Sequence, residues 1–152
     1  MVPALRILEV TILDIYKSLI PIMQGGIIME QIDRLSKALV INSDPDDRKF
    51  LEEMLNEYGY QVKGVAQAYE AAQLFSKEAF SLVISELGFP EFEGMKILDL
   101  VRRFESQAKV VLIAPQVGVE VFIKARARGA FDCLDKPLER SILEQVIAAI
   151  RN

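Results

Sequence analysis

From Leu39 onward, short apolar runs alternate with longer segments in which apolar residues recur at helical spacing. The short runs are Leu39–Ile41, Gln61–Ala66, Leu82–Ser85, Val110–Ala114 and Phe131–Leu134. The first, third and fourth runs are almost continuously apolar, which is typical of strands covered on both faces. Five such strands alternating with helices predict a parallel α/β sheet with helices packed on both of its faces.

The helical segments carry apolar side chains every three or four residues. One marker from each helical segment is Leu51, Leu74, Leu98, Phe122 and Ile147. The pair Asp44-Pro45 is typical of an N-cap followed by proline in the first helical turn. Gly59 and Gly129 stand where a glycine commonly ends a helix. The local turn chemistry therefore agrees with the apolar periodicity.

Residues 1–37 carry a different pattern, a helical stripe ended or kinked by Pro21 and the glycines that follow it. The stripe includes Leu5, Leu8, Ile12, Ile15 and Leu19, which step by three and four residues. We therefore expect two parts, an N-terminal helical extension at 1–37 and an α/β domain at 38–152. The extension packs on its own domain or joins two copies in a dimer. A membrane-surface helix is disfavoured because its polar face has few Lys or Arg residues.

Composition narrows the range of functions. The chain has 152 residues, 51% of them hydrophobic and 26% charged, which suits one folded domain. Its net charge of −4, from 18 basic and 22 acidic residues, comes with no basic patch, so nucleic acid is not an expected ligand. The chain has no His and a single Cys, Cys133, which excludes an internal disulfide and the commonest zinc sites. Such a composition fits the reducing cytoplasm.

The apolar start of the chain predicts neither a membrane span nor a secretory signal. Arg6, Glu9, Asp14 and Lys17 interrupt it, whereas a signal peptide needs a clean apolar stretch. The longest uncharged run there, Ser18–Met29, is shorter than the roughly 18 residues that a span requires. We therefore expect a cytoplasmic protein.

Four stretches resemble the receiver domain of two-component response regulators. They are ALVINSDPDDRKFLEEMLNEYGYQV, LVISELGFPEFEGMKILDLVRR, VVLIAP and ARGAFDCLDKPL. The resemblance covers about residues 38–152, and its most specific signals are the spacing of Pro90 to Gly94 and of Gly129 to Lys136-Pro137. It implies a flavodoxin-like, doubly wound sheet of five parallel strands in the order 2-1-3-4-5, with five helices.

The resemblance also implies a phosphoacceptor pocket at the carboxyl ends of the strands, where open α/β sheets place their chemistry. In the family, a sensor kinase passes a phosphoryl group to an aspartate that ends the third strand; that position is Glu86 here. Two acidic residues that help hold Mg²⁺ are replaced by Asn42 and Ser43. The hydroxyl residue after the fourth strand is replaced by Ala114.

Two further family positions lie on and after the fifth strand. The aromatic switch residue is replaced by Cys133, which we expect to be a small buried hydrophobe. Lys136 matches the family, and the bond to Pro137 that follows is usually cis in the family. Only the lysine is therefore retained from the family's functional set.

These departures argue against phosphoryl chemistry. Mg²⁺ prefers hard anionic oxygens, which Asn42 and Ser43 do not supply, and Asp44 is expected to cap a helix. Glu86 is one methylene longer than aspartate and so places its oxygens about 1.5 Å further out. A displacement of a reacting atom by about 1 Å can slow a reaction about a hundredfold. We expect no metal and no cofactor. Glu86 is either solvated or permanently paired with Lys136.

The fourth helix of the domain suggests a contact surface, because Val119, Phe122 and Ile123 help to make it apolar almost all round. In the family, output usually runs through the fourth helix, fifth strand and fifth helix. We expect this surface and the N-terminal stripe to bury each other, within one chain or across a homodimer, or to bind another protein.

We therefore expect a non-catalytic, receiver-like interaction module that acts independently of phosphorylation. The alternative is a working phosphoacceptor that uses Mg²⁺ and takes its phosphoryl group on Glu86 or a nearby Asp. A small-ligand binder of the flavodoxin kind is disfavoured, because the first loop is acidic and no glycine-rich phosphate motif is present.

Overall fold

The computed structural model describes Asp14 and residues 37–88, 92–104 and 107–151. The chain divides after Leu35, and the second unit carries the fold reported below. Apart from the exposed, helical Asp14 and the strand residue Lys37, the expected N-terminal extension lies outside the described residues, including Leu5, Leu8, Ile12, Ile15 and Leu19.

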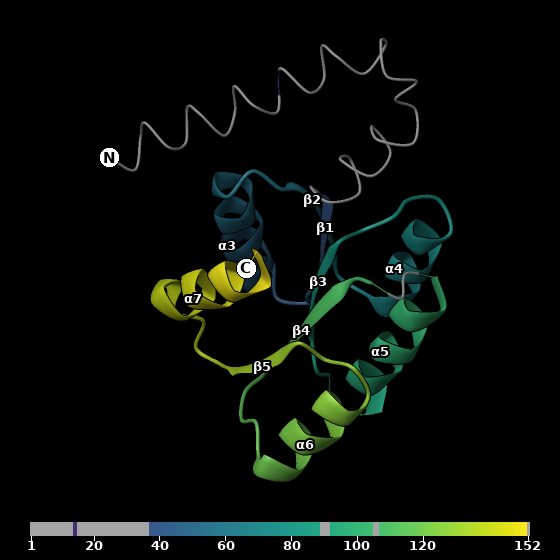
Figure 1. The fold of residues 1–152 in the computed structure, drawn as a ribbon, viewed down its shortest axis with the longest axis vertical. Helices are drawn as coiled ribbons and strands as arrows, with labels where there is room; N and C mark the ends of the chain where they lie inside the picture. Colours follow the sequence, from purple (N-terminus) through teal and green to yellow (C-terminus); the bar gives the residue numbers. More distant parts are fainter. Residues whose placement is uncertain (1–13, 15–36, 89–91, 105–106, 152) are drawn as a thin grey trace. The chain divides into compact units, whose positions relative to one another are not determined.

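Five parallel strands form one sheet in the order β2-β1-β3-β4-β5 (Figure 1). The strands are β1 (Lys37–Ile41), β2 (Gln61–Val65), β3 (Leu82–Glu86), β4 (Lys109–Ala114) and β5 (Asp132–Asp135). Strands β1, β3 and β4 are almost wholly buried, whereas the edge strand β2 is largely exposed. The expected five-stranded, doubly wound fold is confirmed.

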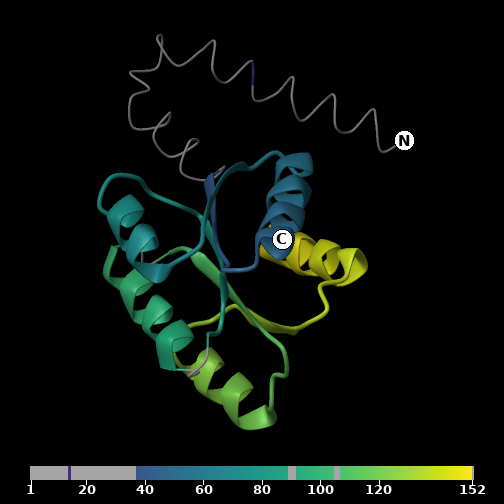
Figure 2. The ribbon, with the colours of Figure 1, turned by 180° about the vertical axis from the view of Figure 1, so that it is seen from behind.

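Five helices cover the two faces of the sheet. They are α3 (Pro45–Glu57), α4 (Ala68–Phe75), α5 (Phe92–Phe104), α6 (Val119–Ala127) and α7 (Arg140–Arg151). Helices α3 and α7 lie on one face, and α4, α5 and α6 lie on the other, as the two opposite views show (Figures 1 and 2). Within the described residues, no helix has both the length and the apolar character needed to cross a bilayer.

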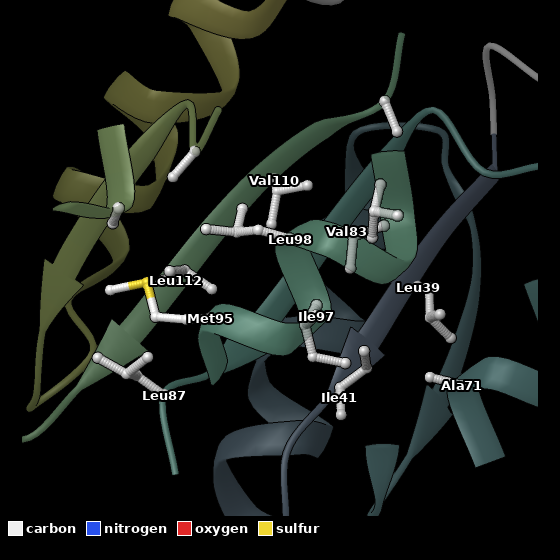
Figure 3. Close-up of a cluster of buried hydrophobic side chains, with 14 of the residues drawn as sticks. Leu39, Ile41, Ala71, Val83, Leu87, Met95, Ile97, Leu98, Val110 and Leu112 are labelled. Carbon is white, nitrogen blue, oxygen red and sulfur yellow. The ribbon is translucent and has the colours of Figure 1, made fainter. Parts of the chain in front are cut away.

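Alternating side chains of the strands divide the core into two apolar clusters. Leu39 and Ile41 of β1 belong to the cluster beneath α4, α5 and α6, which Figure 3 shows in close-up. Ala38 and Val40, the intervening residues, belong to the cluster beneath α3 and α7. Both faces of β1 are therefore covered, which explains why the sequence is apolar without alternation there.

The observed strand boundaries differ from the predicted ones where pairing continues into polar residues. β1 begins at Lys37, which pairs with Gln61, two residues before the predicted start. β5 begins at Asp132 and ends at Asp135, whereas Phe131–Leu134 was predicted. The backbone of Asp135 pairs in register with Ala114, and hydrophobicity alone does not reveal such a pair.

Candidate functional site at the carboxyl ends of the strands

The parallel sheet brings the predicted pocket residues to one edge. Asn42 follows β1, Glu86 ends β3 and Ala114 ends β4. Lys136 follows β5 directly, and its backbone N–H donates to the Ala114 carbonyl at 2.9 Å. These residues therefore lie around the β1/β3 switch point, where the chain leaves toward opposite faces of the sheet.

Asn42 is fully buried and forms a local turn. Its Oδ1 accepts the backbone N–H of Asp44 at 2.9 Å, and its carbonyl accepts Nη1 of Arg48 at 2.8 Å. Its Nδ2 has no hydrogen-bond partner among the described residues. The amide oxygen of Asn42 is thus hydrogen-bonded and its amide nitrogen is not. An unpaired buried donor lowers the free energy of unfolding by about 1–3 kcal/mol.

Asp44 caps helix α3, as predicted. Its carboxylate accepts the N–H of Asp46 at 2.9 Å and of Asp47 at 3.4 Å, and Pro45 occupies the first turn. These bonds satisfy backbone donors that have no partner within the helix. The Asp44 carboxylate is therefore hydrogen-bonded to the first turn of the helix.

Glu86 reaches from the end of β3 to the first loop. Its Oε1 accepts the backbone N–H of Ser43 at 2.8 Å. A hydrogen bond to a charged acceptor is about twice as strong as a neutral one. The carboxylate at the phosphoacceptor position is therefore directed at a backbone donor of the β1–α3 loop.

Lys136 pairs with Asp47, so the alternative in which it pairs with Glu86 is not the one observed. Lys136 Nζ lies 3.1 Å from Asp47 Oδ2, with each side chain about one quarter exposed. No ion pair joins Glu86 to Lys136 in this described part of the chain. Asp47 projects from the first turn of α3, so it supplies a nearer carboxylate. The sequence could have pointed to Asp47 as a site residue because it lies one turn after the cap residue Asp44, but its pairing with Lys136 depends on the tertiary packing.

The remaining positions are mostly apolar. Ala114 is buried and offers only a methyl group. Cys133 is half-buried and packs against the cluster beneath α4–α6, rather than being fully enclosed. Burial, and secondarily the charge of Asp132, raise the pKa of the Cys133 thiol to about 11, although Arg126 acts in the opposite direction. The Lys136–Pro137 peptide bond is cis, as the resemblance implied.

The donor set does not fit Mg²⁺. This ion requires several hard oxygen ligands in tight octahedral geometry. Oδ1 of Asn42 and Oε1 of Glu86 each accept a backbone N–H, and Asp47 pairs with a lysine. Among the residues described, no three His, Cys, Asp or Glu side chains lie together as metal ligands would.

Helix α6 exposes a second surface. Val119, Ile123 and Phe122 are 76%, 59% and 40% exposed, and Ala125 is the helix's one buried residue. A shallow hollow beside them is lined by Val117, Gly118, Val119, Phe122, Cys133 and Asp135. The expected surplus of apolar surface on this helix is therefore exposed within the described domain. The five N-terminal stripe residues expected to meet it lie outside the described part.

Comparison with known proteins places residues 38–148 under the family model for the response regulator receiver domain. The chain is 32% identical over 113 residues to the response regulator protein FleR of Pseudomonas aeruginosa, and 28% identical over 112 residues to PilR of the same species. Each match covers 74% of this chain but only 24% and 25% of FleR and PilR.

The fold is also similar to a response regulator of Thermotoga maritima determined by crystallography. The TM-score is 0.70 at 20% identity, and the match covers 76% of this chain and 97% of the other. At that identity the likeness concerns the fold alone. The chain spans about a quarter of the length of FleR and PilR, so their whole activities do not transfer to it.

Proposed function

This chain belongs to the response regulator receiver domain family, and we propose that its domain is a protein-interaction module of signal transduction that works without phosphorylation. The carrying observation is Glu86 at the phosphoacceptor position, with its carboxylate bonded to the Ser43 N–H at 2.8 Å. A phosphoacceptor carboxylate must instead be free to attack phosphorus from a fixed distance.

The rest of the pocket supports the same proposal. Phosphoryl transfer depends on positioning and on charge stabilisation. Asn42 and Ser43 supply no anionic oxygen for a cation, and Ala114 supplies no hydroxyl for a phosphoryl oxygen. We therefore propose that the domain is not an enzyme, takes no cofactor and functions in the cytoplasm, where its single thiol stays reduced.

The proposed contact surface is the exposed side of α6, formed by Val119, Phe122 and Ile123. Contiguous apolar groups on a surface favour protein contacts. The proposed partner is a protein, in the first instance a second copy of this chain. Contact through the N-terminal stripe belongs to the same proposal. Nucleic acid is not proposed, because the chain is acidic overall.

Intact mass spectrometry tests the proposal directly. The full chain is incubated with acetyl phosphate and Mg²⁺, next to an unrelated receiver that has the aspartate. We expect the control to gain one phosphoryl group and this chain to gain none. A stable gain by this chain that disappears on Glu86→Ala or Asp47→Asn would overturn the proposal and favour the phosphoacceptor alternative.

A further inference from the structure

We infer that the strand-end pocket is closed by its own internal bonds and does not take up a divalent cation. Four residues, here called the clasp, make these bonds: Ser43, Asp47, Glu86 and Lys136. The inference rests on the proposed function, since a receiver that accepts no phosphoryl group has no step for the cation to assist.

The first half of the clasp uses the Glu86 carboxylate. Its Oε1 lies 2.8 Å from the Ser43 nitrogen, so a backbone N–H with its partial positive charge points at one of the two oxygens that a cation could use. A cation bound there would have to break this charge-assisted bond. It would also lie beside the positive end of the N–H dipole, which opposes its charge.

The second half uses Asp47. Lys136 Nζ lies 3.1 Å from Asp47 Oδ2, and about three quarters of each side chain is covered. The ammonium group neutralises this carboxylate at short range. A divalent cation would have to displace the lysine or accept its repulsion, and Mg²⁺ gives up its hydration shell reluctantly.

Asn42 removes a third ligand. The residue is fully buried, its Oδ1 is bonded to the Asp44 N–H at 2.9 Å, and its Nδ2 is an unpaired donor. A carboxylate at this position would present an oxygen where the amide presents N–H groups. The site thus lacks the anionic ligand that would offset the cost of dehydrating a cation.

The clasp joins three separate segments of the chain. Ser43 and Asp47 belong to the β1–α3 region, Glu86 ends β3, and Lys136 follows β5. Bonds between such segments can do the cross-linking that a shared metal ion does elsewhere. We therefore expect clasp bonds, rather than a bound cation, to contribute to the stability of this end of the domain.

Mn²⁺ binding to the full-length wild-type chain tests cation exclusion, with Mn²⁺ alone as the paramagnetic probe in water-proton relaxation. A site with a Kd of about 1 mM would also raise Tm by about 3–8 °C in about 10 mM Mg²⁺. We expect no saturable Mn²⁺ binding and no such shift relative to NaCl at equal ionic strength. Saturable millimolar binding that is lost on Glu86→Ala would overturn the inference.

A gain of binding tests the cause. Asn42→Asp/Ser43→Asp supplies two carboxylates, and Asn56→Asp/Gln73→Glu is the matched control, since it adds two acids at exposed positions of α3 and α4. We expect the double variant to bind Mn²⁺ at least about tenfold more tightly than the control. A folded double variant that matches the control would contradict our explanation, and the wild-type measurement stays decisive if the variant does not fold.

Removing the clasp tests its structural role. Glu86→Ala should lower Tm by about 3–8 °C, and about 10 mM Mg²⁺ should not restore it. An unchanged Tm would contradict the clasp. The inference and the proposed function can fail separately. If the wild-type chain binds Mn²⁺ but gains no phosphoryl group from acetyl phosphate, only the inference is contradicted. If it gains a phosphoryl group, the proposed function is contradicted.

Discussion

The side chains around the start of α3 have different structural roles although they lie within one short segment of the chain. Asp44 caps the helix, Asp47 pairs with Lys136 and Asn42 forms the turn that precedes them. Asp44 and Asp47 are close in sequence and identical in charge, and Asn42 is a neutral amide, yet each of the three side chains is held by a different partner. A chemical change at one of them should therefore have an effect specific to its position.

Asp44→Ala removes the cap and should lower the free energy of unfolding by about 1 kcal/mol, because two backbone N–H groups lose their acceptor. Urea denaturation of the full chain measures the change. Asp46→Ala is the control: it removes a charge from the same first turn but no cap, and should cost only a few tenths of a kcal/mol. Equal losses in the two variants would show that charge, and not capping, matters.

Cys133 should react slowly with thiol reagents. Its pKa of about 11 leaves a thiolate fraction of about 10⁻⁴ at pH 7, and the thiolate is the nucleophile. The labelling rate with Ellman's reagent should rise about tenfold per pH unit towards pH 11. The chain unfolded in guanidinium, with a cysteine pKa near 8.5, is the control and should label far faster. Comparable rates in the two states at pH 7 would refute the raised pKa.

At the scale of elements, one carboxylate, that of Glu78, links lysines of the neighbouring strands β1 and β2. Glu78, in the loop before β3, accepts a hydrogen bond from Lys63 of β2 and lies 3.7 Å from Nζ of Lys37 in β1. The Lys63 hydrogen bond has the largest effect and lowers the pKa of Glu78 below its usual range. Burial, the next largest effect, opposes it, and the charges of Lys63 and Lys37 lower the pKa further. This carboxylate therefore ties the edge strand β2 to β1.

Glu78→Gln should reduce stability at pH 7 by up to about 1 kcal/mol, a typical value for a pair near the surface. Because the folded pKa is lowered, the contribution is present above the unfolded pKa of about 4.3 and is lost as pH falls through the folded value. The difference between variant and wild type should therefore shrink below about pH 4, as measured by urea denaturation across pH. Glu53→Gln is the control, since its pair with Lys49 is wider, at 3.9 Å, and more exposed; it should change little.

The sequence was sufficient to predict elements but not side-chain partners. Buried runs such as Val110–Ala114 identify central strands because both faces need apolar cover. Asp44 was predictable as a cap because capping is local. The partner of Lys136 was not predictable. Its long, flexible side chain pairs with the nearer of Glu86 and Asp47, and those distances are set by the packing of the sheet against α3.

At the scale of the whole molecule, the exposed apolar side of α6 is the surface through which we propose that the described domain associates. A helix that covers a sheet needs only one apolar stripe, and here Ala125 supplies the buried contact. Val119 and Ile123 are more than half exposed, so the fold of the described domain does not require them to be apolar. Their replacement should change association without a large change in stability.

Ile123→Asp should weaken self-association of the full chain at least about tenfold, because a charge in an apolar contact is costly to desolvate. It should change the free energy of unfolding by less than about 0.5 kcal/mol, as is usual for exposed positions. Sedimentation equilibrium measures the first and urea denaturation the second. Tyr69→Ser is the control, since Tyr69 is 68% exposed on α4, outside the proposed surface. Unchanged association in Ile123→Asp would contradict the proposed surface.

Strand β2 has a consequence for how copies of this chain can meet. It forms one border of the sheet, and Gln61, Lys63 and Gly64 on it are exposed. Lysine and glycine on a border strand discourage another chain from adding a strand of its own and extending the ladder. Copies that gather through a helix can therefore remain discrete particles rather than growing into fibrils.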